Sequence, residues 1–197
     1  MQCVLVNPTM SFQVSHKIKY VAFLCLVFVT SSICSNDTAQ IKYDVFVSFR
    51  GEDVRRGFLS HLIELFSQKQ IAFFVDDGIP KGEEISEALF GAIEESYISL
   101  VIFSENYAFS KWCLSELEKI LECRRKNGQT VMPIFYKVDP SDVRHQRRTY
   151  GDAFVKHETK YSFTTVQTWR SALSESANLS GFHLSNFRLV FFFFFCL

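Results

Sequence analysis

The sequence predicts an α/β fold in which helices cover both faces of a parallel sheet of about five strands. Two observations lead to this prediction. Short runs of β-branched and aromatic residues alternate along the chain with longer segments whose apolar residues recur at helical spacing. The strand runs are almost continuously apolar, as is typical of parallel strands buried on both faces. Alternating strands and helices form right-handed crossovers, so we expect a doubly wound, flavodoxin-like three-layer architecture.

The strands are expected where apolar runs are bounded by turn residues. The first and fourth are the clearest, with sequences YDVFVSF and TVMPIFY, and the fifth is the weakest. The five expected strands are Tyr43–Phe49, Ile71–Val75, Tyr97–Phe103, Thr130–Tyr136 and Gly181–Leu184.

The helices are expected where apolar residues lie three or four positions apart. Positions 58, 62, 65 and 66 form such a stripe in the first helix, and Ile85, Ala88, Leu89, Ala92 and Ile93 form one in the second. The polar segment 137–148 is predicted to be a loop because it contains Asp-Pro and few apolar residues. The expected helices are Val54–Lys69, Glu83–Glu95, Trp112–Arg125, Tyr150–His157 and Thr165–Ala177.

Composition divides the chain of 197 residues into a domain, residues 41–184, and two apolar flanks. Lys and Arg number 21, as do Asp and Glu, so the formal net charge is zero. A balanced charge excludes a polyanion binder that acts through bulk positive charge, and no nucleic-acid partner is expected. Residues 41–184 are numerous enough to bury a core of their own.

The flanks carry few charges. Residues 1–40 contain only Lys17, Lys19 and Asp37, and they include the apolar run Tyr20–Val29. This run is typical of a signal peptide and short for a membrane-spanning helix, so export, a membrane anchor and a mistaken start in the gene model stay open. Residues 185–197 contain five consecutive phenylalanines and no helical or strand period, and we expect them to lie outside the fold.

Ligands of doubly wound folds bind at the carboxyl ends of the strands. Here those ends carry the loops Phe49–Asp53, Asp76–Gly82, Ser104–Trp112 and Lys137–Arg144. The chain has no GxxxxGK[ST] phosphate loop, no GxSxG elbow and no GxGxxG after the first strand, which argues against three large enzyme classes. The pair Asp76-Asp77 is better explained as a loop than as a metal site, and no metal is expected.

The segment Ser110–Arg125 holds the strongest candidate for chemistry. Trp112, Glu116 and Ile120 are spaced by four and share one helical face, so Glu116 is a carboxylate beside an indole. An apolar wall of this kind suits a carboxyl group to hydrogen bonding or acid/base work. Cys113 as a nucleophile, with His61 or His145 as its base, is the weaker alternative, because a buried cysteine usually serves as a small apolar residue.

Five segments resemble one family, the plant Toll/interleukin-1 receptor (TIR) domains. They read YDVFVSFRGEDVRRGFLSHL, FFVDDGIPKGEEI, AIEESYISLVIFSENYAFSKWCLSELEKILE, VMPIFYKVDPSDVRHQ and YGDAFVKHE. The resemblance covers about residues 41–184 and indicates either a TIR-only protein or the TIR part of a disease-resistance protein. It implies a flavodoxin-like fold and hydrolysis of NAD⁺ at the nicotinamide–ribose bond in immune signalling.

The resemblance also implies roles for individual residues. The catalytic glutamate of the family falls on Glu116 in the motif WCLSEL. Phe49, Arg50 and Gly51 match the nucleotide-contacting loop after the first strand, and Trp112 would border the ribose. NAD⁺ is expected as a substrate, with no separate cofactor.

Self-association is expected to complete the family's site. Ser60 and His61 match its helical dimer motif, and Asp77, Lys81 and Gly82 fall in a loop that packs between subunits. This loop is one residue shorter than the common pattern. A homo-oligomer, and association with other TIR-type immune receptors in the cytoplasm, are the expected partnerships. The rival interpretation is a non-catalytic adaptor that acts only through TIR–TIR contacts.

Overall fold

The computed structural model describes residues 41–75 and 87–184. Its centre is a five-stranded sheet in which every neighbouring pair is parallel, in the order β2-β1-β3-β4-β5. The predicted α/β fold with a parallel sheet is therefore confirmed. The strands are β1 (Tyr43–Phe49), β2 (Phe73–Val75), β3 (Ser96–Phe103), β4 (Thr130–Tyr136) and β5 (Phe182–Leu184).

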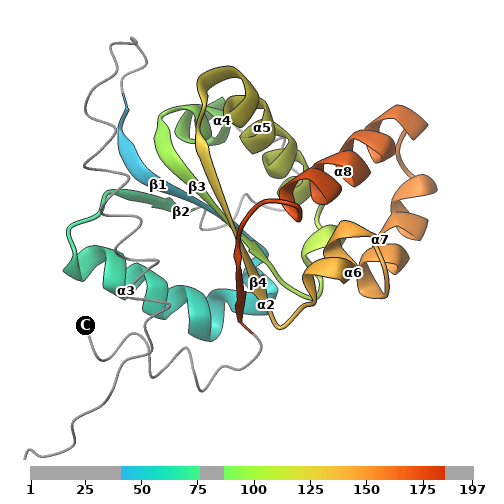
Figure 1. Ribbon diagram of the computed structural model, residues 1–197, viewed down its shortest axis with the longest axis horizontal. Coiled ribbons are helices and arrows are strands. Elements are labelled where there is room, and N and C mark those ends of the chain that lie inside the picture. The colour runs from blue at the N-terminus through green and yellow to red at the C-terminus, as the bar shows by residue number, and fades with distance from the viewer. Residues whose placement is uncertain (1–40, 76–86, 185–197) are drawn as a thin grey trace, which may run out of the picture.

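Helices cover both faces of this sheet (Figure 1). One face packs against the segment that follows β1, and the other packs against helices that lie between residues 87 and 176. The elements are α2 (Gly51–Val54), η1 (Arg55–Leu59), α3 (Ser60–Gln68), α4 (Glu87–Glu94), η2 (Tyr107–Phe109), α5 (Lys111–Asn127), α6 (Pro140–Arg144), α7 (Thr149–Glu158) and α8 (Phe163–Ser176).

Alternation along the strands decides which side chain meets which layer. In β1, Val45, Val47 and Phe49 belong to the apolar cluster on the α3 face, whereas Phe46 belongs to the cluster on the α5 face. Ser48 has the same parity as Phe46 and therefore faces α5. This parity is what brings a serine hydroxyl to the helix that carries Glu116.

The prediction of one continuous helix over Val54–Lys69 is wrong. Helical structure begins at Gly51 and breaks at Arg56 and Gly57, where Gly57 adopts a φ of 137°. A positive φ is inexpensive only for glycine, so the chain turns there before α3 begins. The expected apolar stripe is confirmed, because Phe58, Leu62, Leu65 and Phe66 are all buried.

Smaller differences concern the second strand and the second helix. β2 has three residues and is half-buried, where a five-residue buried strand was predicted, because it forms the edge of the sheet. In α4, Leu89, Ala92 and Ile93 are buried as expected, but Ala88 is exposed. Ile85 lies outside the described residues.

The segment predicted to be a loop before α7 contains a helix, α6. Asp139 begins it, since the Asp139 side chain accepts a hydrogen bond from the backbone N–H of Ser141 at 2.7 Å, and Pro140 occupies the first turn. Both features favour a helix start. Within the described ranges, no helix is long and apolar enough to cross a membrane; the apolar run Tyr20–Val29 lies outside them.

Candidate functional site

Glu116 lies in the second turn of α5, with 5% of its surface exposed. The helix starts at Ser110, whose side chain accepts a hydrogen bond from the backbone N–H of Cys113 at 3.3 Å. It ends at Gly128, which takes the left-handed conformation that commonly closes helices. Glu116 shares the buried face of this helix with apolar residues such as Leu117 and Ile120, and the packing of that face turns it inward toward β1.

A row of hydrogen bonds holds the Glu116 carboxyl group from β1 and η2. The Ser48 hydroxyl contacts Glu116 Oε2 at 2.7 Å and the Tyr107 hydroxyl at 2.9 Å. Tyr107 in turn donates to the backbone carbonyl of Cys113 at 3.0 Å. Ser48 and Tyr107 are completely buried. Buried carboxyl groups require such partners, because an unpaired one is strongly disfavoured in an apolar interior.

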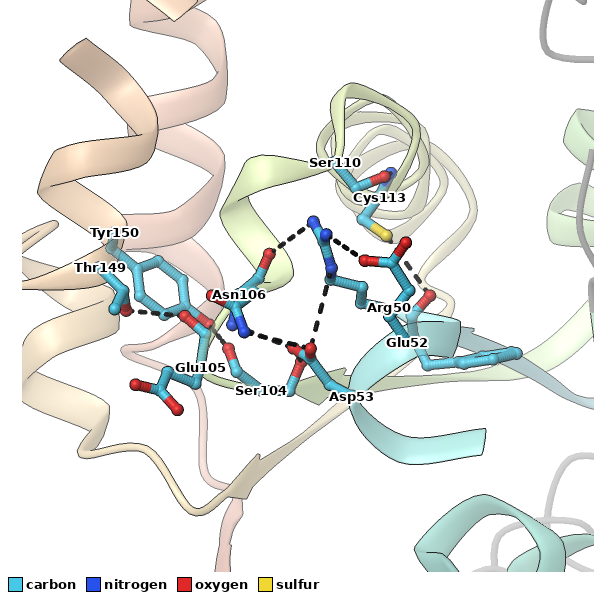
Figure 2. A network of polar contacts seen from close by, with 11 residues as sticks. Arg50, Glu52, Asp53, Ser104, Glu105, Asn106, Ser110, Cys113, Thr149 and Tyr150 are labelled. Atoms are coloured by element: carbon cyan, nitrogen blue, oxygen red, sulfur yellow. Dashed lines mark hydrogen bonds and ion pairs between the residues drawn. The ribbon is translucent and has the colours of Figure 1, made fainter. Parts of the chain in front are cut away.

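Arg50 lies next to this row, in the loop that leaves β1. Figure 2 shows its side chain extending toward the N-terminal turn of α5, where Ser110 and Cys113 lie. The guanidinium group donates to the carbonyl of Asn106 at 3.1 Å and pairs with Glu52 at 2.5 Å. Its Nε lies 3.8 Å from Asp53 Oδ1. These contacts hold a positive charge at the carboxyl end of β1.

Asp53 joins the loop after β1 to the loop after β3 (Figure 2). Its carboxylate accepts hydrogen bonds from the Ser104 hydroxyl at 2.5 Å, from the backbone N–H of Asn106 at 3.0 Å and from the Asn106 side chain at 3.2 Å. The Tyr150 hydroxyl of α7 donates to the carbonyl of Ser104 at 2.8 Å. Two of the four loops predicted to form the site are therefore fastened to each other.

The other residues expected to contact the substrate do not all lie on the same side of the sheet as Glu116. Trp112 lies one turn before it, is partly exposed, and has the Lys111 ammonium 3.9 Å from the centroid of its ring. Phe49 is 7% exposed and packs on the opposite, α3 face of the sheet. Only its backbone reaches α5, where its carbonyl accepts a hydrogen bond from the Cys113 thiol at 3.4 Å. Gly51 begins α2 directly after Arg50. Substrate contact stays a prediction for all four residues, Arg50 included.

The structure opposes Cys113 as a nucleophile. Its thiol is buried, and burial, followed by the neighbouring Glu116 charge, raises the pKa of Cys113 far above its ordinary value. The reactive species in cysteine chemistry is the thiolate, which these surroundings disfavour. Cys113 therefore acts as a small core residue that also hydrogen-bonds Phe49.

The residues expected in self-association fall elsewhere. Ser60 is exposed at the start of α3, where its hydroxyl donates to the carbonyl of Gly57 at 2.8 Å, and His61 is half-buried beside it. Both belong to the helical layer across the sheet from Glu116. Asp77, Lys81 and Gly82 lie outside the described residues, as does the Asp76-Asp77 pair. In the part of the chain that is described, no cluster of His, Cys, Asp or Glu has the arrangement of a metal site.

Sequence reasoning missed three contributors: Ser48, Tyr107 and Asp53. A signal existed for Ser48, because a serine on the buried face of an otherwise apolar strand needs a polar partner. Asp53 carried a weaker signal as an acidic residue just after a strand. Tyr107 carried none, because its role depends on the tertiary packing that brings its hydroxyl group to Ser48.

Fold and site together define a flavodoxin-like α/β domain with a buried glutamate at the carboxyl edge of its sheet. The TIR domain family model matches residues 42–193, and the chain belongs to this family. It is 52% identical over 150 residues to TMV resistance protein N of Nicotiana glutinosa and 51% identical over 142 residues to disease resistance protein RPV1 of Vitis rotundifolia.

These alignments cover 75% and 72% of this chain but only 13% and 10% of the relatives, so the chain corresponds to a small part of each. Among solved structures, the TIR domains of the activated Roq1 resistosome, which directly recognises the pathogen effector XopQ, match with a TM-score of 0.67 and 47% identity. That match covers 74% of this chain and 89% of the Roq1 chain.

Proposed function

We propose that this TIR domain is an NAD⁺ glycohydrolase that acts in plant immune signalling, with Glu116 as its catalytic residue. The observation that carries the proposal is the buried Glu116 carboxyl group, held by Ser48 at the carboxyl edge of the sheet. Its position is where doubly wound folds bind ligands. Membership of the TIR family and similarity to plant disease-resistance proteins support the immune role.

The reaction would break the bond between ribose C1′ and the nicotinamide nitrogen. The bonding electrons leave with nicotinamide, which is a cation in NAD⁺ and departs as a neutral molecule. Positive charge then develops on the ribose as an oxocarbenium-like centre, which a nearby carboxylate stabilises. Water adds to C1′ and loses one proton, so the products are nicotinamide, ADP-ribose and H⁺; attack by a group of the substrate itself would give a cyclic product.

Two neighbouring side chains suit the rest of such a substrate. Arg50 carries a positive charge that can pair with the pyrophosphate of the substrate. Its contacts with Asn106 and Asp53 orient the guanidinium group. Trp112 offers an aromatic surface one turn from Glu116, on the partly exposed side of α5. Phe49 and Gly51 would contribute through the backbone that leaves β1.

The test is nicotinamide release from NAD⁺, followed by chromatography at high protein concentration. We expect release by the parent protein and its loss, by at least about 100-fold, in Glu116→Gln, since an electrostatic contribution of this kind is typically that large. Glu122→Gln is the matched control, because Glu122 lies on the same helix but pairs with Lys126 at the surface. Absence of release from a folded, self-associated parent would refute the enzyme and favour the adaptor.

Self-association forms the second part of the proposal. The Roq1 match, to TIR domains within a resistosome, supports an assembly of TIR domains as the active form. We expect light scattering to detect concentration-dependent association that Ser60→Ala combined with His61→Ala weakens. The control Lys160→Ala, at an exposed position in the turn after α7, should not weaken it. Equal association of all three proteins would exclude this face of α3.

Cytoplasmic location is part of the same proposal, because NAD⁺ is an intracellular substrate. The competing interpretation rests on Tyr20–Val29. A reporter fused to residues 1–40 distinguishes the two, since secretion of the reporter would contradict the cytoplasmic assignment.

A further inference from the structure

Three hydrogen-bonding contacts form a row behind Glu116, and the hydroxyl groups supply too few hydrogens for them. The contacts join Glu116 Oε2 to Ser48 Oγ, Ser48 Oγ to Tyr107 Oη, and Tyr107 Oη to the carbonyl oxygen of Cys113, at 2.7, 2.9 and 3.0 Å. A serine and a tyrosine hydroxyl carry one hydrogen each. A carbonyl can only accept, so the contact between Tyr107 and Cys113 needs the hydrogen of Tyr107.

The remaining hydrogen of Ser48 cannot serve both of its contacts. If Glu116 is ionised, Ser48 donates to the carboxylate. The one hydrogen of Tyr107 then serves either the 2.9 Å contact with Ser48 or the contact with Cys113, so one of these two contacts has no hydrogen. If Glu116 is protonated, it donates to Ser48, Ser48 donates to Tyr107 and Tyr107 donates to Cys113. Only the protonated form gives every contact in the row one hydrogen.

We propose that Ser48 and Tyr107 are positioning residues for Glu116, whose hydroxyl groups orient its carboxyl group and act in opposite senses on its protonation. Ser48 favours the carboxylate, because it is the donor that the charged form uses. Tyr107 favours the neutral acid, because both of its contacts carry a hydrogen only when Glu116 is protonated, and only one does when Glu116 is ionised. The consequence for catalysis rests on the proposed function, while the hydrogen count does not.

Titratable groups from several elements surround the row. Burial, followed by the charges of Cys113 and Glu116, raises the pKa of Tyr107 well above its ordinary value. Tyr150 of α7 acts on Tyr107 in the same direction, and Arg50 and Asp53, beyond β1, act on Cys113 in opposite directions. Tyr107 therefore keeps its hydrogen throughout the range in which a carboxyl group titrates.

The experiment measures the protonation of Glu116 directly, without relying on catalysis. The full chain is labelled with ¹³Cδ-glutamate, and the Glu116 resonance is assigned by its absence in Glu116→Gln and followed against pH. Ser48→Ala should move the titration midpoint of Glu116 up by about one pH unit, because a charge-assisted hydrogen bond is lost. Tyr107→Phe should move it down by about half a unit, because the protonated form then loses two hydrogen-bonded contacts and the ionised form only one.

The chain offers matched controls for both substitutions. Ser99 is a completely buried serine on the neighbouring strand β3 that donates to Gln129. Tyr150 is a completely buried tyrosine that donates to a backbone carbonyl, as Tyr107 does. Ser99→Ala and Tyr150→Phe remove the same groups from the core and should leave the Glu116 midpoint within a few tenths of a unit.

Opposite shifts in the two variants support the proposal. Shifts of the same sign, no shift in a folded variant, or equal shifts in the controls would overturn it. Each variant is decisive alone. If Ser48→Ala does not fold, Ser48→Cys replaces it. Because Cys retains a weak donor, its upward shift should be smaller than the roughly one pH unit expected for Ser48→Ala. Opposite shifts in a protein that releases no nicotinamide would refute the proposed function and leave the positioning role intact.

Discussion

The Asp53 carboxylate accepts a hydrogen bond from the Ser104 hydroxyl at 2.5 Å, and this contact ties the end of β1 to the end of β3. The two strands are neighbours in the sheet, so Asp53 closes the gap between the loops that follow them. Asn106 and Arg50 complete the contacts of the same carboxylate. The loop that presents Arg50 is therefore held by a partly buried network and not by its own turn alone.

Loss of the Asp53 carboxylate should destabilise the domain. We expect Asp53→Ala to lower the free energy of unfolding by about 2–3 kcal/mol, because several donors lose their acceptor at once. Glu52→Ala is the control: the Glu52 side chain is 72% exposed, and its ion pair with Arg50 should contribute less than about 1 kcal/mol. Urea unfolding measures both, and equal effects would show that the network does not stabilise the domain.

Two glycines should respond to alanine in opposite directions. Gly57 has a φ of 137° at the break before α3, so Gly57→Ala should destabilise the protein by about 1–2 kcal/mol. Gly91 lies inside α4 with nothing within 4 Å of an added Cβ, so Gly91→Ala should stabilise it by about 0.5–1 kcal/mol. Thermal melting compares the two. If Gly57→Ala left the melting temperature unchanged, the chain would be able to turn there without a glycine at positive φ.

Stability should fall at alkaline pH. Burial raises the pKa of Tyr107 and of Tyr150 well above their ordinary value. A pKa raised by folding contributes stability that is complete below the unfolded value, about 10 for tyrosine, and is lost as pH rises above it. Each tyrosine adds up to about 1.4 kcal/mol per pH unit to this loss.

The urea midpoint measured from pH 8 to pH 11 tests this expectation. Tyr150→Phe should make the decline above about pH 10 shallower, since one of the two titrating groups is gone. A decline that is equally steep in Tyr150→Phe would assign the alkaline instability to other groups.

Cys113 should resist alkylation in the native protein. Its burial and the raised pKa of its thiol both disfavour the thiolate, whereas unfolding removes both effects. Peptide mass spectrometry after iodoacetamide treatment should find Cys113 modified only when a denaturant is present. Rapid native modification that abolishes nicotinamide release would instead restore the nucleophile interpretation.

Part of the candidate site could be predicted because its residues form a local pattern. The i, i+4 spacing of Trp112 and Glu116 placed the carboxylate on a partly buried helical face, and Glu116 is 5% exposed. Arg50 could be assigned to the carboxyl end of β1 because the apolar run stops there. The same reasoning could not foresee that the Phe49 ring turns to the α3 face, since that depends on strand parity relative to two helical layers.

By itself, the sequence determined the order of the strands and of the longer helices, the parallel sheet and the family, because apolar periodicity and motif order are properties of the chain read along its length. Tertiary structure alone decided which polar groups meet. Ser48 and Glu116 are 68 residues apart, and Asp53 and Ser104 are 51 apart. No local preference connects such pairs. They form because strand parity, helix register and the pairing of β1 with β3 place them within hydrogen-bonding distance.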